Sequence, residues 1–454
     1  MKSLIGDKKF YRMVLIVCIP IVIQNGFTNF ASLLDNIMIG QLGTLSMSGV
    51  SISNQLFQVF NVSVFGAMSG AGIFLAQFYG RGNRDGVHNC FRIKMLLGLL
   101  ISILAICIFK ILGPSLISLY LNDDPTDSMT TLNFGKQYMD VMLIGLIPFA
   151  ITQVFSSSLR ETGNTVLPMK ASVIAVIVNF CINYILIFGH FGFPKLGVIG
   201  AAIGTVVSRI VEMGINIAAG LNNNYLRDAM RLDKISGDIF KNVVKRGIPL
   251  LCNEILWSIS IALISQCYST RGLEAVAAIN ITTTVTNFFM IICYAMGNSI
   301  SIIVGQRLGA GEIEYAKDCD LKMVFMNFMM CLCIGVALFL CSSFIPQIYN
   351  TSMEVKSLAT SLLRVSACML PIISLYYSSY FTMRAGGKTL LTFFFDSGYT
   401  FMFTFMVALC LTRFTDLPIF NVYLLVQCVD IPKAVLGITL VKKGIWVHNI
   451  VNEL

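Results

Sequence analysis

The sequence predicts an all-α membrane protein that crosses the bilayer twelve times. Three observations predict this fold class: the composition, a regular succession of long apolar runs, and a duplication within the chain. Of the 454 residues, 56% are hydrophobic and only 12% are charged, and the mean hydropathy is +0.78. A soluble domain usually carries about 25% charged residues. The composition therefore indicates a polytopic membrane protein.

Each apolar run is long enough to cross a bilayer core, which takes about 20 residues. Every run must be helical, because backbone amides in lipid need hydrogen-bond partners within their own segment. The predicted spans are 12–34, 48–76, 93–113, 137–157, 168–189, 197–220, 247–268, 276–304, 322–345, 358–382, 388–411 and 418–440.

The basic residues give the expected orientation of these spans. Most of the 32 Lys and Arg residues lie in the N-terminal segment, in alternate loops and in the C-terminal tail. By the positive-inside rule, that side is cytoplasmic, and both termini lie there. We expect a multi-pass protein of the plasma (inner) membrane. The net charge of +9 does not predict a nucleic-acid partner, because the basic residues are spread over short loops.

An internal duplication relates the two halves of the chain. One constant offset, with no gap, connects Pro20 with Pro249, Gly43 with Gly272, and the motif that runs from Gln77 to Gly82 with the one from Gln306 to Gly311. Farther along, the segment 160–165 recurs as 384–389. A shared offset over such a length indicates duplication rather than chance.

Each half contains six predicted spans, so both halves enter the membrane in the same orientation. Parallel repeats of this kind occur in secondary transporters. We predict two pseudo-symmetric six-helix lobes, at 1–220 and 247–454, joined by a cytoplasmic linker at 221–246. Two lobes around a midplane site permit alternating access, which a receptor or an enzyme needs less. The duplication therefore favours transport over catalysis.

Three acids within the spans are candidates for function: Asp35 at the end of the first, Glu254 in the seventh and Asp396 in the eleventh. A carboxylate inside a span costs about 2.5–3.5 kcal/mol on insertion scales. None of the three has a Lys or Arg within a helical turn. Each must find a distant partner, be protonated or bind a cation. A purely structural role, with hydrogen bonds that hold helices together, is the alternative.

Two other acids have a local partner. Glu212 stands three residues from Arg209, and Asp430 stands three residues from Lys433. This spacing places both members of a pair on one helical face, so we predict two local ion pairs.

Amide and hydroxyl groups supply further candidate ligands. Asn179 and Asn183 share one face of the fifth span, and Thr205 lies on the sixth. Such polar groups can bind an ion, or they can hold helices together in the membrane.

The sequence argues against nucleotide-driven transport. The segment 386–389 resembles the end of a phosphate-binding loop, but Thr382 stands where that loop requires glycine. The 3 histidines are scattered and form no metal motif. We expect no nucleotide and no cofactor.

Several motifs together resemble the multidrug and toxic compound extrusion (MATE) family. They are Pro20 with Asp35-Asn-Ile-Met-Ile-Gly-Gln-Leu-Gly43, the duplicated motif at 77–82 and 306–311, Asn179-Phe-Cys-Ile-Asn183, Gly200-Ala-Ala-Ile-Gly-Thr205, Arg384-Ala-Gly-Gly-Lys-Thr389 and the closing segment from Gly444. The resemblance covers nearly the whole chain and both of its halves.

The resemblance implies a transporter that exports cationic or amphipathic compounds in exchange for Na⁺ or H⁺. In the family, an acid on the first span forms an ion site with polar groups on the fifth and sixth. Those positions here are Asp35, Asn179, Asn183 and Thr205, of which Asp35, Asn179 and Asn183 would hold Na⁺. Some members have a second acid where this chain has Asn183.

One branch of the family also uses an acid early in the seventh span, which Glu254 matches approximately. The aspartate that this branch carries on the tenth span falls near Ile373 here and is absent, so we infer that Asp396 serves instead.

We therefore expect a monomeric antiporter in the lipid bilayer, which is not an enzyme and which binds small cationic or amphipathic molecules. A flippase for lipid-linked sugars of the same superfamily is the alternative. It would carry a strongly basic central cavity, and few basic residues lie within the predicted spans.

Overall fold

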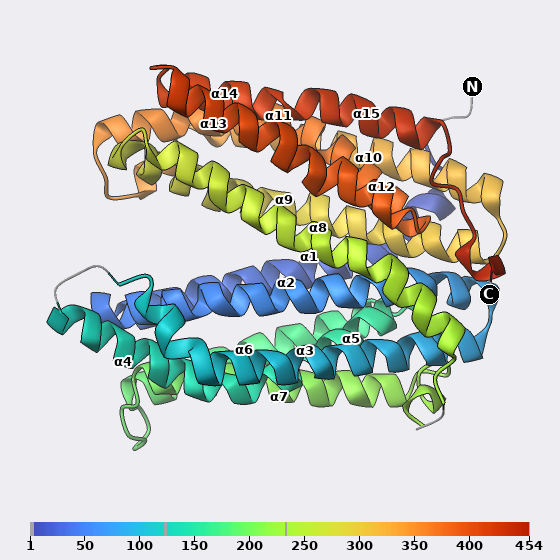
Figure 1. Ribbon diagram of the computed structural model, residues 1–454, viewed down its shortest axis with the longest axis horizontal. Coiled ribbons are helices and arrows are strands. Elements are labelled where there is room, and N and C mark those ends of the chain that lie inside the picture. The colour runs from blue at the N-terminus through green and yellow to red at the C-terminus, as the bar shows by residue number, and fades with distance from the viewer. Residues whose placement is uncertain (1–3, 122–124, 232–233, 454) are drawn as a thin grey trace. The chain divides into compact units, whose positions relative to one another are not determined.

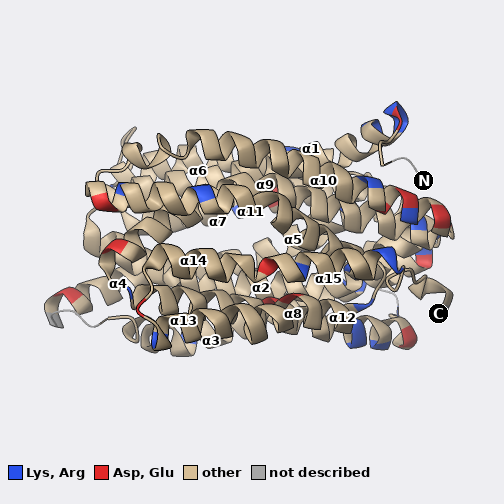
Figure 2. Ribbon diagram, turned by 90° about the horizontal axis from the view of Figure 1, so that it is seen from above, with Lys and Arg blue, Asp and Glu red and all other residues tan. Residues whose placement is uncertain are grey.

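A computed structural model describes residues 4–121, 125–231 and 234–453. Within these residues the regular secondary structure is entirely helical, and twelve segments are long and apolar enough to cross a membrane. The predicted fold class is confirmed. Figure 2 shows that the charged residues gather largely at the ends of the helices.

Most spans are single α-helices (Figure 1). These are α1 (Lys8–Gly40), α2 (Thr44–Arg81), α3 (Arg84–Ser118), α6 (Val166–Phe188), α7 (Val198–Leu221), α8 (Gly237–Ser269), α9 (Leu273–Gly309), α10 (Ile313–Cys341) and α11 (Met353–Ala385).

The other three spans are assembled from shorter helices. The fourth joins α4 (Pro125–Met142), the 3₁₀ turn η1 (Leu143–Gly145) and α5 (Leu146–Glu161). The eleventh joins α12 (Thr389–Phe393), the π-helices η4 (Phe394–Gly398) and η5 (Thr400–Phe405), and α13 (Met406–Phe414). The twelfth joins α14 (Ile419–Cys428) and α15 (Asp430–Lys442). Short 3₁₀ turns lie at η2 (Asp228–Met230), η3 (Ile345–Ile348) and η6 (Ile450–Glu453).

The helices extend farther than the apolar runs from which the spans were predicted. The first span was expected at 12–34, but α1 has 33 residues and ends at Gly40. A helix of that length rises about 50 Å, more than the ~30 Å of the hydrocarbon core. Polar residues can therefore continue the helix into the interface, and Asp35 lies inside α1 rather than at its end.

The chain forms two compact units. Unit 1 contains Met1–Val22, Ala76–Gly82 and Ile248–Leu454, and unit 2 contains Ile23–Leu75 and Asn83–Gly247. The helices α1, α2 and α8 each contribute to both units. The lobe boundaries predicted from the sequence stay a prediction.

Within each unit one helix is central. In unit 1, α11 packs against α9, α10, α14 and α15. In unit 2, α7 packs against α4, α5 and α6. The side chains at these contacts are mostly apolar and buried. Elsewhere in unit 2, α3 packs against α5, where the rings of Phe91 and Phe155 meet edge to face.

The two copies of the duplicated motif meet within unit 1. A Cβ atom at Gly80 would collide with the backbone carbonyl of Gln306, and a Cβ atom at Gly309 would collide with that of Gln77. The contact is reciprocal because the two motifs are equivalent. Gln77 is fully buried, and its side chain binds Ala385 O and Ile450 N at 3.0 and 2.9 Å. The duplicated glycines therefore permit a backbone contact that no other residue type allows.

We predict that Gly80→Ala lowers the stability of the purified protein. The added methyl group would force the two backbones apart, at a cost of about 1–3 kcal/mol. Gly214→Ala is the matched control, because a Cβ atom there meets nothing within 4 Å; alanine at this helical position should be neutral or stabilising by up to about 1 kcal/mol. The measurement is thermal unfolding in detergent, and equal midpoints for the two variants would contradict the role of the contact.

Candidate functional site

The four residues predicted for the ion site on the first, fifth and sixth spans lie together in unit 2. Asn183 donates from Nδ2 to Asp35 Oδ1 at 2.7 Å and to Asn179 Oδ1 at 3.3 Å. Asn179 Nδ2 in turn lies 3.5 Å from Thr205 Oγ1. A chain of amide and hydroxyl groups thus links α1, α6 and α7.

Local sequence explains this arrangement. The i,i+4 spacing aligns Asn179 with Asn183 on α6. Gly204 on α7 lies directly against the Asn183 amide, and a side chain there would collide with Asn183 Oδ1. This oxygen is buried and has no hydrogen-bond partner. Such an oxygen is a candidate ligand for a hard cation, because hard cations prefer oxygen ligands.

Asp35 has no counter-charge at contact distance in the part of the chain that the structure describes. None of the described Lys, Arg and His residues forms an ion pair with its carboxylate, which accepts a hydrogen bond from Asn183. The Asp35 carboxylate lines a pocket in unit 2, and Arg209 is the one basic residue among the described residues that line it. Most of the other polar lining groups are neutral amides and hydroxyls: Ser32, Asn36, Ser51, Asn54, Gln55, Gln58, Asn61, Tyr138 and Thr205.

The sequence reasoning did not assemble this pocket as a whole. Tyr138 and Gln58 were not singled out, although Tyr138 donates to Asn54 Oδ1 at 3.2 Å and Gln58 lines the same wall. The signal was available on α2, where Asn54, Gln58 and Asn61 recur at i, i+4 and i+7 and so share one helical face.

The predicted pair of Arg209 and Glu212 does not form among the described contacts. Arg209 lies over the Phe149 ring, 4.9 Å from its centre, and donates to Gly145 O at 3.4 Å. Glu212 accepts a hydrogen bond of 2.5 Å from Ser172. Each side chain has a partner on a neighbouring segment of unit 2, so the prediction from helical spacing alone was wrong.

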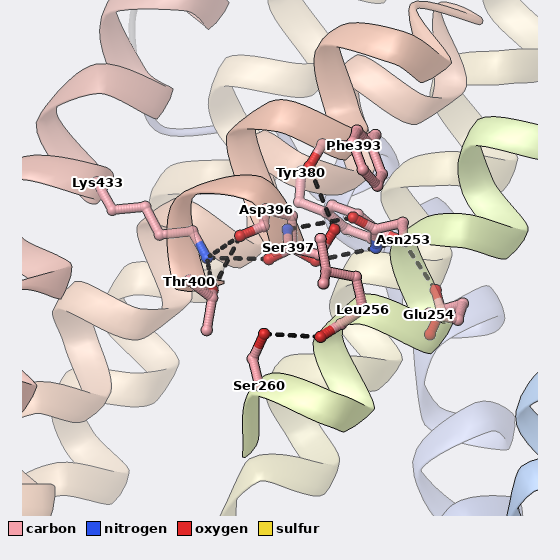
Figure 3. A network of polar contacts seen from close by, with 10 residues as sticks. All are labelled: Asn253, Glu254, Leu256, Ser260, Tyr380, Phe393, Asp396, Ser397, Thr400 and Lys433. Carbon is pink, nitrogen blue, oxygen red and sulfur yellow. Dashed lines mark hydrogen bonds and ion pairs between the residues drawn. The ribbon is translucent and has the colours of Figure 1, made fainter. Parts of the chain in front are cut away.

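Unit 1 holds a second polar cluster, shown in Figure 3. Tyr380 donates to Glu254 Oε1 at 3.1 Å, and Asn253 donates to Asp396 Oδ2 at 3.1 Å. The 3.5 Å contact of Asn253 Nδ2 with the Tyr380 hydroxyl joins these two acids through neutral groups. Glu254 and Asp396 thus belong to one network, from α8 through α11 to η4.

Asp396 has found a distant partner. Lys433 Nζ lies 2.9 Å from Asp396 Oδ1, so this lysine pairs across helices and not with Asp430 as predicted. The i,i+3 spacing of Asp430 and Lys433 reveals neighbours on one helix only. Asp396 belongs to η4 of another span, so the spacing could not predict this partner.

The sequence reasoning also missed an acid. Asp320 is 1% exposed on α10, where Thr382 donates to its Oδ1 at 2.5 Å. The predicted ninth span began at 322, and Asp320 was therefore assigned to a loop.

A second interhelical ion pair, besides that of Asp396 with Lys433, connects α3 and α5. In it, Lys94 Nζ lies 2.5 Å from Glu161 Oε2.

We predict that Asn253→Ala destabilises the protein by about 1–3 kcal/mol. The change would remove the hydrogen bond that Asn253 donates to Asp396 Oδ2 and the one that it accepts from Ser397 N. Asn242→Ala is the control on the same helix, because Asn242 is half-buried and its amide donates to Asp238 O of its own helix rather than to an acid of another span. Thermal unfolding in detergent compares the two, and a loss of stability no larger than that of the control would contradict the role of Asn253.

Two relatives with curated names cover most of the chain. A probable multidrug resistance protein NorM of Thermotoga maritima is 26% identical over 379 residues, which are 82% of this chain and 80% of that protein. The multidrug resistance protein MdtK of Pectobacterium atrosepticum is 23% identical over 355 residues, which are 77% of this chain and 76% of that protein.

Solved structures share the fold. A crystal structure of MATE in complex with MaL6 has a TM-score of 0.85 at 20% identity and covers 97% of both chains. A mutant of the Vibrio cholerae MATE transporter VcmN has a TM-score of 0.86 at 17% identity and covers 96% of this chain and 97% of that one. The MatE family model matches residues 20–185 and 249–410, so that both halves of the duplication are included. The chain therefore belongs to the MATE family of multidrug efflux transporters.

Proposed function

We propose that this protein exports cationic or amphipathic organic compounds in exchange for Na⁺ or H⁺, with Asp35 as the group that accepts the coupling ion. One observation carries the proposal: a carboxylate within a membrane span lines a pocket, accepts a hydrogen bond from an amide and forms no ion pair with any Lys, Arg or His that the structure describes. Intramembrane acids of this kind mark ion and substrate pathways.

The neighbours of Asp35 are suited to binding a cation. Asn183 fixes one carboxylate oxygen, while the buried Asn183 Oδ1 has no donor of its own. A Na⁺ ion would satisfy Asp35, Asn183 and Asn179 through oxygen ligands. A proton would neutralise the carboxylate directly. Either ion removes an uncompensated charge from the pocket.

Exchange then follows from linkage. An ion that neutralises Asp35 changes the affinity of the pocket for a cationic substrate, and the substrate changes the affinity for the ion by the same factor, typically by about 1–3 kcal/mol. Alternating access by the two halves of the duplicated chain would convert this coupling into export. A single chain contains both halves, so we expect a monomer to suffice and no catalytic step to be needed.

The pocket in unit 2 favours a cationic substrate over the flippase alternative. A site for a lipid-linked sugar phosphate needs several basic groups, and the described lining of the pocket contains one, Arg209. The relatives named as multidrug resistance proteins agree with organic substrates. The distribution of Lys and Arg supports insertion in the plasma membrane with both termini in the cytoplasm.

We predict that Asp35→Asn abolishes ion-driven efflux, because asparagine can neither take up a proton nor provide a charge for Na⁺. The measurement is dye efflux from proteoliposomes under an imposed Na⁺ or pH gradient, which also identifies the ion. Asp140→Asn makes the same chemical change at a residue whose side chain is 41% exposed and pairs with Lys110, and it should retain efflux. Full efflux by folded Asp35→Asn would refute the proposal.

We predict a smaller effect for Glu254→Gln. Tyr380 would keep a neutral acceptor, and Asp35 would remain available, so the coupling-ion concentration that gives half-maximal efflux should rise while efflux persists. Glu274→Gln, at an exposed position of α9, is the control. If the ion dependence of Glu254→Gln equals that of the control, Glu254 has no part in ion binding.

A further inference from the structure

The side chain of Lys433 ends in a site that satisfies an ammonium ion completely. Only 2% of this side chain is exposed. An ammonium group has three N–H donors, and Nζ has three oxygen acceptors: Asp396 Oδ1 at 2.9 Å, Thr400 Oγ1 at 3.2 Å and Asp396 O at 3.3 Å. The lysine chain occupies the remaining direction.

Aromatic rings surround the same ammonium group. Nζ lies 4.5 Å from the centre of the Tyr376 ring, 5.8 Å from that of Phe395 and 5.9 Å from that of Tyr399. Rings within about 6 Å attract a cation through their quadrupoles, and aromatic cages of this kind recognise organic ammonium ligands. The combination of three rings, a carboxylate and two further oxygens is the chemistry of a ligand site rather than of a simple ion pair.

Other residues of unit 1 hold the groups of this site in position (Figure 3). Asn253 fixes Asp396 Oδ2 at 3.1 Å and accepts from Ser397 N at 3.2 Å. Tyr399 donates to Val429 O at 2.9 Å, which anchors one ring of the cage. Asp396 and Thr400 belong to the two π-helices of the eleventh span, and π-helical segments are frequent at functional sites. Most of the cage is therefore positioned by groups other than Lys433.

We propose that unit 1 contains a binding site for primary alkylammonium ions, centred on Asp396, and that the chain fills this site with its own Lys433. The lysine acts as a tethered ligand that keeps an external cation away from Asp396. This inference rests on the proposed function, since it assigns ion coupling to Asp35 and removes Asp396 from the acids that can load a free ion.

The structure of the lysine side chain determines which small molecule can test the site. Lys433→Ala keeps Cβ and removes three carbons and the ammonium group, so that propylammonium is the fragment that has been deleted. The cage that remains should bind it from solution. 1-Propanol has a similar shape but no charge. It should bind at least roughly tenfold more weakly, because it lacks both the attraction to the Asp396 carboxylate and the cation–π attraction.

The experiment measures thermal unfolding of the full-length protein in detergent against propylammonium concentration. Lys433→Ala should unfold at a lower temperature than the wild type, and propylammonium should raise this temperature saturably. The wild type should respond no more to propylammonium than to 1-propanol, because its site is filled. Asp396→Asn/Lys433→Ala should lose the response, because the carboxylate is gone.

Two outcomes would overturn the inference: a folded Lys433→Ala variant that shows no saturable response, or an equal response when Asp396 is also replaced. If Lys433→Ala does not fold alone, the readout becomes the yield of monodisperse protein purified with propylammonium or with 1-propanol. Recovery with propylammonium alone supports the site, and recovery with neither overturns it.

The same titration in an Asp35→Asn background separates this inference from the proposed function. The propylammonium response of Asp35→Asn/Lys433→Ala should equal that of Lys433→Ala, because Asp35 belongs to unit 2. A retained response together with retained efflux by Asp35→Asn would refute the coupling role of Asp35 alone. A lost response in Lys433→Ala, with efflux abolished in Asp35→Asn, would refute the alkylammonium site alone.

Discussion

The cost of leaving a carboxylate uncompensated among apolar helices governs the polar architecture of this protein. Water is scarce there, so each buried acid needs a cation, a proton or several hydrogen-bond donors. Glu161 has Lys94, and Asp396 has Lys433. Asp35 has, within the described part of the chain, a hydrogen bond from the Asn183 amide and no ion pair. Glu161 and Asp396 are thus compensated by a lysine within the helix packing, whereas the proposed function gives Asp35 the role of responding to ions from solution.

The duplication accounts for the scaffold, but the two halves have diverged at the acids. At the offset that relates Gly80 with Gly309, Asp35 corresponds to Ile264 and Glu254 corresponds to Asn25. The duplicated glycines were retained, since their backbones touch and admit no side chain. The position of a carboxylate can differ between the halves at lower cost, because a carboxylate needs hydrogen-bond donors or a cation rather than one exact backbone position. The two halves therefore share a backbone plan and differ in how they handle charge.

Much of this could be predicted from sequence, for a physical reason. Span length, helicity and duplication depend on local hydropathy and on spacing along the chain, and the twelve spans are confirmed. The grouping of Asp35 with Asn179, Asn183 and Thr205 was expected from the family resemblance and not from spacing. The partners of Asp396 and Glu212 could not be predicted, because they come from other helices and depend on rotations that the sequence does not display. Asp320 was lost at a predicted boundary, since helices continue past the apolar run.

The π-helices of the eleventh span show why such rotations matter. A π-helix inserts one residue into the helical turn and so changes the direction of every side chain that follows it. In an uninterrupted α-helix, Asp396 and Thr400 would share a face, and the rings of Phe395 and Tyr399 would share a neighbouring one. In the wider helix, groups from both pairs reach the Lys433 ammonium. The wider helix thus brings two oxygen-bearing residues and two rings of one short segment to the Lys433 ammonium, Tyr376 of α11 adds the nearest ring, and the lysine compensates the charge that the segment brings into the membrane.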